Sequence, residues 1–197
     1  MPQGRLELII GPMFSGKSTE LIRHIRMLRV INASYVVIKP RMDSRYDSNK
    51  IVSHNQESET CIVVDDLNEI ADEFIRSADY LIIDEGQFLQ NLKSKVLYWV
   101  ETMGKNVILG GLDGDFQRNP IGEILQLIPY ADAYSKKTAL CKMCNDGTPA
   151  LFSHRVSNEN KAQICIGSTE SYIPLCRRHY LFSTCNQIDC AIFLQVT

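Results

Sequence analysis

LELIIGPMFSGKST, residues 6–19, is an apolar run followed at once by a glycine-rich segment. Gly11, Gly16, Lys17 and Ser18 have the spacing G-x-x-x-x-G-K-[ST], in which backbone amides surround phosphate oxygens and the lysine pairs with their charge. The apolar run is typical of a buried strand, and the residues after the motif have helical spacing, which is the context that the motif requires. This stretch therefore predicts a phosphate-binding loop for a nucleoside triphosphate.

Short apolar runs and helical patterns alternate beyond this loop. Continuous apolar runs of this length are typical of buried parallel strands. The alternation predicts an α/β fold of the phosphate-loop, RecA-like kind, with a mostly parallel sheet and flanking helices. The expected strands are residues 6–10, 35–39, 61–64, 80–83 and 106–111, and the expected helices are 17–31, 67–76, 91–103 and 120–128. Residues 41–50 are expected to form a loop over the sheet.

The alternation stops near residue 136, which predicts a change of architecture. We expect residues 1–135 to form the nucleotide-binding domain, residues 136–182 a small metal-stapled β lobe, and residues 183–197 a C-terminal tail. A lobe of that size needs a staple because its own core is small.

The composition narrows the class of protein. The 197 residues include 45% hydrophobic residues, enough for a real core, and 21 basic against 23 acidic residues. This balance predicts neither a nucleic-acid partner nor an anionic membrane surface. No apolar stretch approaches the roughly 20 residues of a membrane span, and no signal peptide is evident, so the expected location is the cytoplasm. The seven cysteines are then expected to be thiols, some of them bound to metal.

Two carboxylates follow the fourth apolar run, in YLIIDEGQF, residues 80–88. An aspartate at a strand end holds Mg²⁺ together with the loop serine in phosphate-loop enzymes, and Asp84 and Ser18 suit these roles. Because successive strand side chains diverge, Glu85 is expected to face the phosphoryl acceptor. The residues alone leave alternatives open: Glu85 is the general base for an acceptor hydroxyl, or it positions a water for ATP hydrolysis or merely caps a turn.

Two paired motifs indicate a structural zinc site. Cys141 and Cys144 form a C-x-x-C pair, and Cys176 and His179 form a C-x-x-H pair. Three thiolates and one imidazole make a closed Zn²⁺ site that holds structure and performs no chemistry. Cys185 and Cys190 are further possible ligands, so Cys185 remains an alternative to His179.

Together these segments resemble the short, zinc-containing thymidine kinases of cells and large DNA viruses. The resemblance runs from about residue 5 to about residue 182 and includes GPMFSGKSTELIR, DSRY, IDEGQF, LDGDFQRNPIGEILQLIP and the paired zinc ligands. It implies ATP-dependent phosphorylation of thymidine at its 5′-hydroxyl to give thymidine monophosphate. Glu85 is then the general base, and Ser18 and Asp84 serve Mg²⁺.

The resemblance also implies the remaining site residues. Those near the ATP phosphates are Gly11, Pro12, Met13, Phe14, Ser15, Gly16, Lys17, Ser18, Asp43, Arg45, Asp84 and Gln87. Those near thymidine are Phe116, Gln163, Ile164, Cys165, Ile166, Gly167 and Tyr172. The resemblance further implies a homotetramer, feedback inhibition by thymidine triphosphate, and no nucleic-acid or membrane partner. The chain departs from the family pattern at His179, where a cysteine is common, and at Gly167-Ser168, where the family has a glycine pair.

A second hypothesis comes from another class of protein. A phosphate-loop ATPase could use Glu85 to activate water and use the zinc lobe to dock a protein or nucleic acid. The balanced charge counts against nucleic acid, and the full set of motifs favours the kinase.

Overall fold

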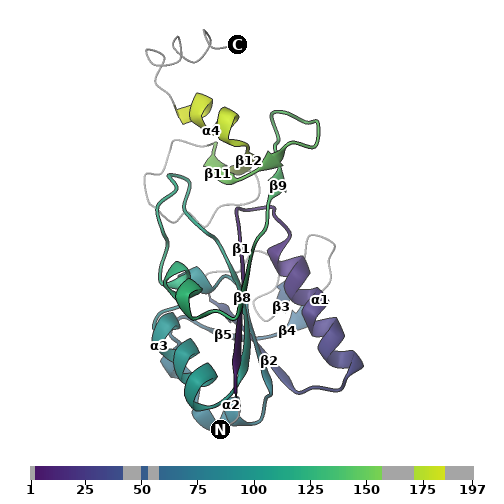
Figure 1. The fold of residues 1–197 in the computed structure, drawn as a ribbon, viewed down its shortest axis with the longest axis vertical. Helices are drawn as coiled ribbons and strands as arrows, with labels where there is room; N and C mark the ends of the chain where they lie inside the picture. Colours follow the sequence, from purple (N-terminus) through teal and green to yellow (C-terminus); the bar gives the residue numbers. More distant parts are fainter. Residues whose placement is uncertain (1–2, 42–49, 53–57, 157–170, 185–197) are drawn as a thin grey trace.

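A six-stranded sheet forms the centre of the computed structural model, which describes residues 3–41, 50–52, 58–156 and 171–184 (Figure 1). The strand order is β5-β2-β6-β7-β1-β8, and each neighbouring pair is parallel. The strands are β1 (Arg5–Ile10), β2 (Tyr35–Pro40), β5 (Ile62–Val64), β6 (Tyr80–Ile83), β7 (Asn106–Gly111) and β8 (Ala133–Lys136). The first five confirm the expected strands, and β8 is an addition. It alternates half-buried and exposed residues because it lies at the edge of the sheet.

Helices cover both faces of this sheet. On one face lies α1 (Lys17–Val30), whose Leu21, Ile22, Ile25 and Leu28 are buried against apolar residues of the central strands. The other face is covered by shorter elements: α2 (Asp72–Arg76), α3 (Leu92–Leu97), the π-helical turn η3 (Tyr98–Thr102) and the 3-10 helix η4 (Ile124–Tyr130). The apolar pattern of α1 also includes Met27, but this side chain is 53% exposed and does not belong to the core.

Two expected helices differ from the structure. The segment 67–76 is divided into the 3-10 turn η1 (Leu67–Glu69) and α2, because Ile70 and Ala71 are extended. The segment 120–128 forms no α-helix. Gly122 has a left-handed backbone with φ of 57°, and a 3-10 helix begins only at Ile124. The segment 91–103 is helical as expected, with α3 continuing into the π-turn η3.

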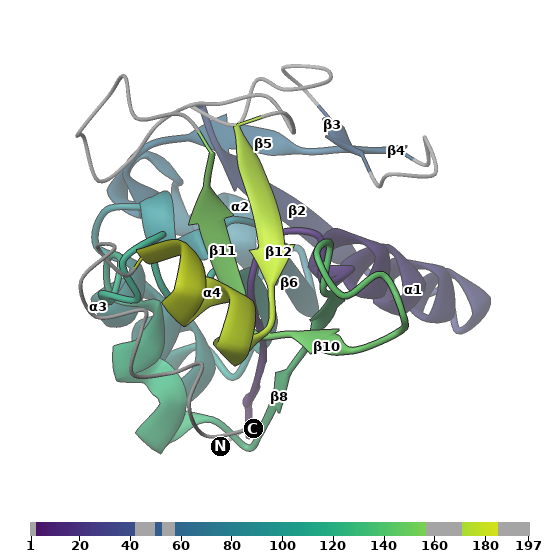
Figure 2. The same ribbon diagram turned by 90° about the horizontal axis from the view of Figure 1, so that it is seen from above.

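A small lobe stands over the carboxyl ends of the sheet strands (Figures 1 and 2). Two antiparallel pairs and one helix form it: β9 (Ala139–Leu140) with β10 (Pro149–Ala150), β11 (Phe152–Arg155) with β12 (Tyr172–Leu175), and α4 (Arg177–Thr184). Phe14 of the loop after β1 packs against the lobe core. Since ligands of open α/β sheets bind outside the carboxyl ends of the strands, the lobe covers the place where a ligand is expected.

Two further observations complete the fold. A separate antiparallel hairpin joins β3 (Lys50–Val52) and β4 (Ser58–Thr60). Among the described residues, none of the helices combines the length and the apolar character needed to cross a membrane.

Candidate active site

The segment from Gly11 to Gly16 forms the loop between β1 and α1. Gly11 N–H donates to the Gly111 carbonyl at 3.3 Å, which fixes the start of the loop against the end of β7. Gly16 has a left-handed φ of 78° directly before α1, a conformation that glycine adopts without a side-chain penalty. Lys17 Nζ and Ser15 Oγ both donate to the Pro12 carbonyl, at 2.8 and 2.7 Å. A glycine-rich loop that opens a helix N-terminus, with a lysine folded over it, is a phosphate-binding arrangement.

Asp84 follows β6 and approaches the first turns of α1. Both β1 and β6 pair with β7, so the phosphate loop and Asp84 lie on either side of the end of β7. A Cβ atom added to Gly110 would lie 3.4 Å from Asp84 Oδ1 and 2.8 Å from Leu21 Cδ1. The Asp84 carboxylate and α1 therefore meet over Gly110, which has no side chain to keep them apart. This position is consistent with the expected pairing of Asp84 with Ser18.

Glu85 adopts a left-handed backbone, with φ of 51° and ψ of 39°. For a residue with a long side chain this conformation costs about 1–3 kcal/mol and persists only where its surroundings impose it. Its N–H donates to Asp84 Oδ1 at 2.9 Å, and Gln87 Nε2 donates to Glu85 Oε2 at 2.6 Å. Strand β6 ends at Ile83, so Asp84 and Glu85 are not successive residues of a strand. The two carboxylates are separated by the left-handed turn at Glu85 instead.

Gln87 is buried and makes a second bond across the site. Its Oε1 accepts from the Leu112 N–H at 2.9 Å, so the side chain links the Glu85 carboxylate to the segment after β7. In the structure Gln87 therefore orients Glu85, while a contact between Gln87 and ATP phosphates stays a prediction.

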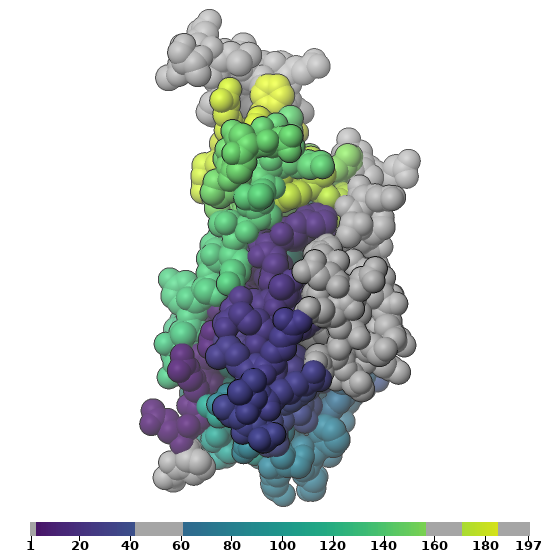
Figure 3. All heavy atoms as spheres, turned by 90° about the vertical axis from the view of Figure 1, so that its right-hand side faces the viewer, coloured from purple at the N-terminus to yellow at the C-terminus, as the bar shows by residue number. Residues whose placement is uncertain are grey.

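Strand β11 connects the phosphate loop to an aromatic pair. Ser153 Oγ accepts from the Met13 N–H at 2.9 Å. Two residues further on, the Arg155 guanidinium lies 4.0 Å from the centre of the Phe116 ring and donates to Tyr172 Oη. Since side chains two apart on a strand point to the same side about 7 Å from each other, both contacts lie on one face of β11. Figure 3 shows this closeness of the lobe and the N-terminal segment.

Phe116 and Tyr172, both expected near thymidine, are thus brought together by Arg155. Phe116 is half-buried, and its carbonyl accepts from Tyr180 Oη at 2.7 Å. Tyr172 is buried on β12. The expected site residues Asp43, Arg45, Gln163, Ile164, Cys165, Ile166 and Gly167 lie outside the described residues, so their roles stay predictions.

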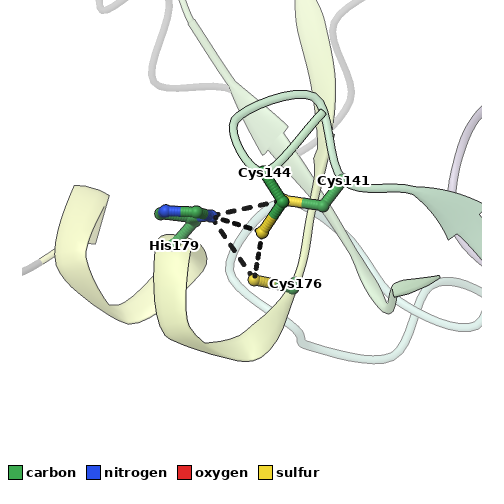
Figure 4. A group of neighbouring side chains, drawn as sticks. All are labelled: Cys141, Cys144, Cys176 and His179. Atoms are coloured by element: carbon green, nitrogen blue, oxygen red, sulfur yellow. Dashed lines mark hydrogen bonds between the residues drawn. The ribbon is translucent and has the colours of Figure 1, made fainter. Parts of the chain in front are cut away.

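The four expected zinc ligands form one cluster (Figure 4). The Nδ1 atom of His179 lies 3.4 Å from Cys141 Sγ, 3.3 Å from Cys144 Sγ and 3.5 Å from Cys176 Sγ. Cys144 Sγ and Cys176 Sγ are 3.8 Å apart. A tetrahedral Zn²⁺ with Zn–S distances of about 2.3 Å sets its sulfur atoms about 3.8 Å apart and a ligating nitrogen about 3.5 Å from each sulfur. The donor set and its spacing therefore fit zinc, with His179 Nδ1 as the fourth ligand. Cys185 and Cys190 lie outside the described residues.

The thiols of this cluster differ in acidity. Burial opposes ionisation of Cys141, but hydrogen bonds from backbone N–H groups and from His179 outweigh it and lower the pKa of this thiol to about 6. Burial and the neighbouring Cys141 and Cys176 raise the pKa of Cys144 to about 11. Ionising a second thiol beside Cys141 would place like charges close together, and a bound divalent cation would offset that repulsion.

Ser153 and Arg155 belong to this site but were not predicted from the sequence. Both are buried on one face of β11, whereas their neighbours Phe152 and His154 are only partly buried. The alternation in FSHR is typical of a strand, and its polar residues, Ser153 and Arg155, suggest that they lie on an exposed face. In the structure that face is buried.

Comparison with known proteins agrees with this geometry. A sequence model of the family described as thymidine kinase matches residues 4–180. A thymidine kinase of Yaba monkey tumor virus is 43% identical over 177 residues, which cover 90% of this chain and 94% of the viral protein. One of Bacteroides thetaiotaomicron is 39% identical over 179 residues, covering 91% and 88%. One of rice, Oryza sativa subsp. japonica, is 36% identical over 183 residues, covering 90% of this chain and 66% of the plant protein. With this match over most of its length, the chain belongs to the thymidine kinase family.

Proposed function

We propose that this protein transfers the γ-phosphoryl group of ATP to the 5′-hydroxyl of thymidine. One observation carries the proposal: the single strand β11 contacts both the phosphate loop, through Ser153, and the aromatic pair Phe116 and Tyr172, through Arg155. A site that joins a triphosphate cradle to a surface for a flat base suits a nucleoside acceptor. An ATPase that only activates water does not require a surface for a flat base.

Glu85 is the proposed general base. Its carboxylate takes the proton of the 5′-hydroxyl as the oxygen bonds to the γ-phosphorus and the bond to the departing ADP breaks. The Gln87 amide, 2.6 Å from Glu85 Oε2, restricts the carboxylate to one orientation. The strained backbone at Glu85 supports this role, because such conformations are retained where function requires a fixed side-chain direction.

The phosphate loop and its lysine are the proposed electrostatic partners. Amides of the loop and Lys17 Nζ bind the phosphate oxygens and stabilise the charge that develops on them. From the resemblance, Asp43 and Arg45 add contacts to the phosphates. Ser18 and Asp84 would hold Mg²⁺, which neutralises phosphate charge when it is bound with ATP.

The zinc site has a proposed structural role in this reaction. Residues 163–167, expected to bind the thymine edge with backbone groups, lie in the sequence between the two pairs of zinc ligands. A metal that joins Cys141 and Cys144 to Cys176 and His179 closes this segment into a loop anchored at both ends. We also propose the division into residues 1–135, 136–182 and 183–197, with the metal stabilising the middle unit.

Assembly and regulation are carried over from the resemblance. We propose a homotetramer that is inhibited by thymidine triphosphate and works in the cytoplasm. Light scattering, inhibition kinetics and cell fractionation test these three points separately.

The reaction is tested by incubating the protein with ATP, Mg²⁺ and thymidine and measuring thymidine monophosphate by mass spectrometry. Parallel samples contain deoxycytidine or no nucleoside. Product formed from thymidine, with ADP release that depends on thymidine, is the expected result. ADP released at the same rate without nucleoside, and no monophosphate, would instead favour the ATPase with a docking lobe.

A further inference from the structure

Arg155 is a buried arginine at the centre of the aromatic pair. It is 6% exposed and lies at the end of β11, in register with Tyr172 of β12. Its Nε and Nη2 donate to Tyr172 Oη at 3.1 and 2.6 Å. Its guanidinium carbon lies 4.0 Å from the centroid of the Phe116 ring. One side chain therefore contacts a ring from the segment after β7 and a hydroxyl from the lobe.

These two contacts use different parts of the guanidinium. The N–H donors bond within the guanidinium plane, whereas the flat faces of the group stack on aromatic rings. A group that uses both fixes a ring and a hydroxyl relative to each other. A lysine can supply the charge but not the planar fork. An apolar side chain can fill the space but would leave Tyr172 Oη without these two donors.

The cost of burial also distinguishes Arg155 from a packing residue. Removing a guanidinium from water is expensive unless its contacts compensate. The Phe116 backbone already has a separate anchor, since its carbonyl accepts from Tyr180 Oη at 2.7 Å. The contact with Arg155 therefore affects the orientation of the Phe116 ring more than the position of the Phe116 backbone.

We infer that Arg155 is a positioning residue for nucleoside binding: it holds the Phe116 ring and Tyr172 in the arrangement that receives the base. Arg155 lies over the Phe116 ring, and Phe116 as a residue is only half-buried, so part of its surface is available to a base. This inference rests on the proposed function. It adds a residue that acts through two others and need not touch the substrate.

The inference predicts a selective kinetic defect. Loss of Arg155 leaves the phosphate loop and Glu85 in place but lets the ring and the hydroxyl move. The KM for thymidine should rise by about 10-fold to 100-fold, the scale expected when a binding surface is misplaced by about 1 Å. The KM for ATP should change by less than about twofold.

The test compares Arg155→Met and Arg155→Lys with a matched control, Arg177→Met. Arg177 also lies over an aromatic ring of the lobe, at 5.0 Å from the centroid of Phe152, but it is exposed, and the contact described for it is with Phe152 and not with Phe116 or Tyr172. For each protein the KM for thymidine, the KM for ATP, kcat, the zinc content and the melting temperature are measured. Tyr172→Phe, alone and combined with Arg155→Lys, is measured in the same way because it removes the hydroxyl that Arg155 binds.

Support consists of a raised KM for thymidine in both Arg155 variants, a smaller rise for lysine than for methionine, and an unchanged Arg177→Met. In the double variant the effects of Arg155→Lys and Tyr172→Phe should be less than multiplicative, because the two residues share one interaction. If both Arg155 variants keep a KM for thymidine within twofold of the starting protein, or if both KM values rise while the zinc content falls, the positioning role is wrong. If Arg155→Met does not fold, Arg155→Lys and the Tyr172 comparison still decide. A starting protein that forms no thymidine monophosphate contradicts the proposed function itself, which the first assay of the series reveals before any variant is compared.

Discussion

Glu85→Gln removes the proposed proton acceptor but preserves the geometry of the side chain. The substitution keeps the length of the side chain and its left-handed backbone, and the new amide oxygen can still accept from Gln87 Nε2 at the place of Glu85 Oε2. Folding should therefore change little, by less than about 1 kcal/mol, because one hydrogen bond to a charged acceptor becomes a bond to a neutral one. The proton acceptor, in contrast, is lost completely.

The expected kinetic loss follows from that difference. A general base contributes about 10²–10⁴ in rate, so kcat should fall by this factor, equivalent to about 3–5.5 kcal/mol of transition-state stabilisation. The assay is the rate of thymidine monophosphate formation at saturating ATP and thymidine, together with the dissociation constant of ATP, which should not change. Glu73→Gln is the control, since Glu73 is a strongly exposed glutamate of α2 with a side chain 79% exposed.

A kcat within tenfold of the starting protein would refute the role of Glu85 as base. It would also show that the strained backbone at this position serves another purpose. An equal loss in Glu73→Gln would point to a general effect of removing a carboxylate, and the reasoning from site geometry would fail.

The remaining predictions concern metal, packing and the core. Folded protein should contain one zinc per chain by atomic emission. The zinc content should fall in His179→Ala and stay unchanged in Cys185→Ser. A loss of zinc in Cys185→Ser alone would instead identify Cys185 as the fourth ligand. Gly110→Ala should reduce kcat more than tenfold and lower stability by about 1–3 kcal/mol, because its Cβ would lie 2.8 Å from a buried Leu21 methyl group; unchanged thermal melting would contradict this. Trp99, the single tryptophan, is fully buried, and its Nε1 has no hydrogen-bond partner among the described residues, so Trp99→Phe should change the free energy of unfolding in urea by less than about 1.5 kcal/mol. A much larger loss would mean that the indole makes an essential contact.

Much of the fold was predictable because the signals are local. The run before Gly11 and the run 80–83 are continuously apolar, and such runs identify central parallel strands without knowledge of their partners. Strand β8 lacked that signal because an edge strand buries only part of each residue. The 3-10 helix at Ile124 was mistaken for an α-helix because the apolar spacing does not reveal the left-handed Gly122.

The residues of the site also differ in how much local sequence signal they carry. The phosphate loop, the DE pair and the zinc ligands occur as short motifs, so their residues were found from sequence. Ser153 acts through Met13, 140 positions away, and Arg155 acts through Tyr172, 17 positions away, and through Phe116 of a different segment. Nothing within FSHR distinguishes a buried arginine from an exposed one. Gln87 was expected at the phosphates. Its hydrogen bond to Glu85 depends on the conformation of the turn after β6, which the sequence did not predict.

The position of β1 in the sheet has a consequence for the order in which the molecule is made. β1 pairs only with β7 and β8 among the described strands, whereas β2 pairs with β5 and β6, which follow it closely in the chain. During synthesis at about 5–20 residues per second, β1 therefore waits for roughly 100 further residues, about 5–20 s, before its neighbours emerge. Until then the apolar residues Leu6, Leu8 and Ile9 are available to chaperones or to other nascent chains. The strand that carries the phosphate loop is thus expected to join the sheet late, so the ability to bind ATP should appear only as the last part of the sheet assembles.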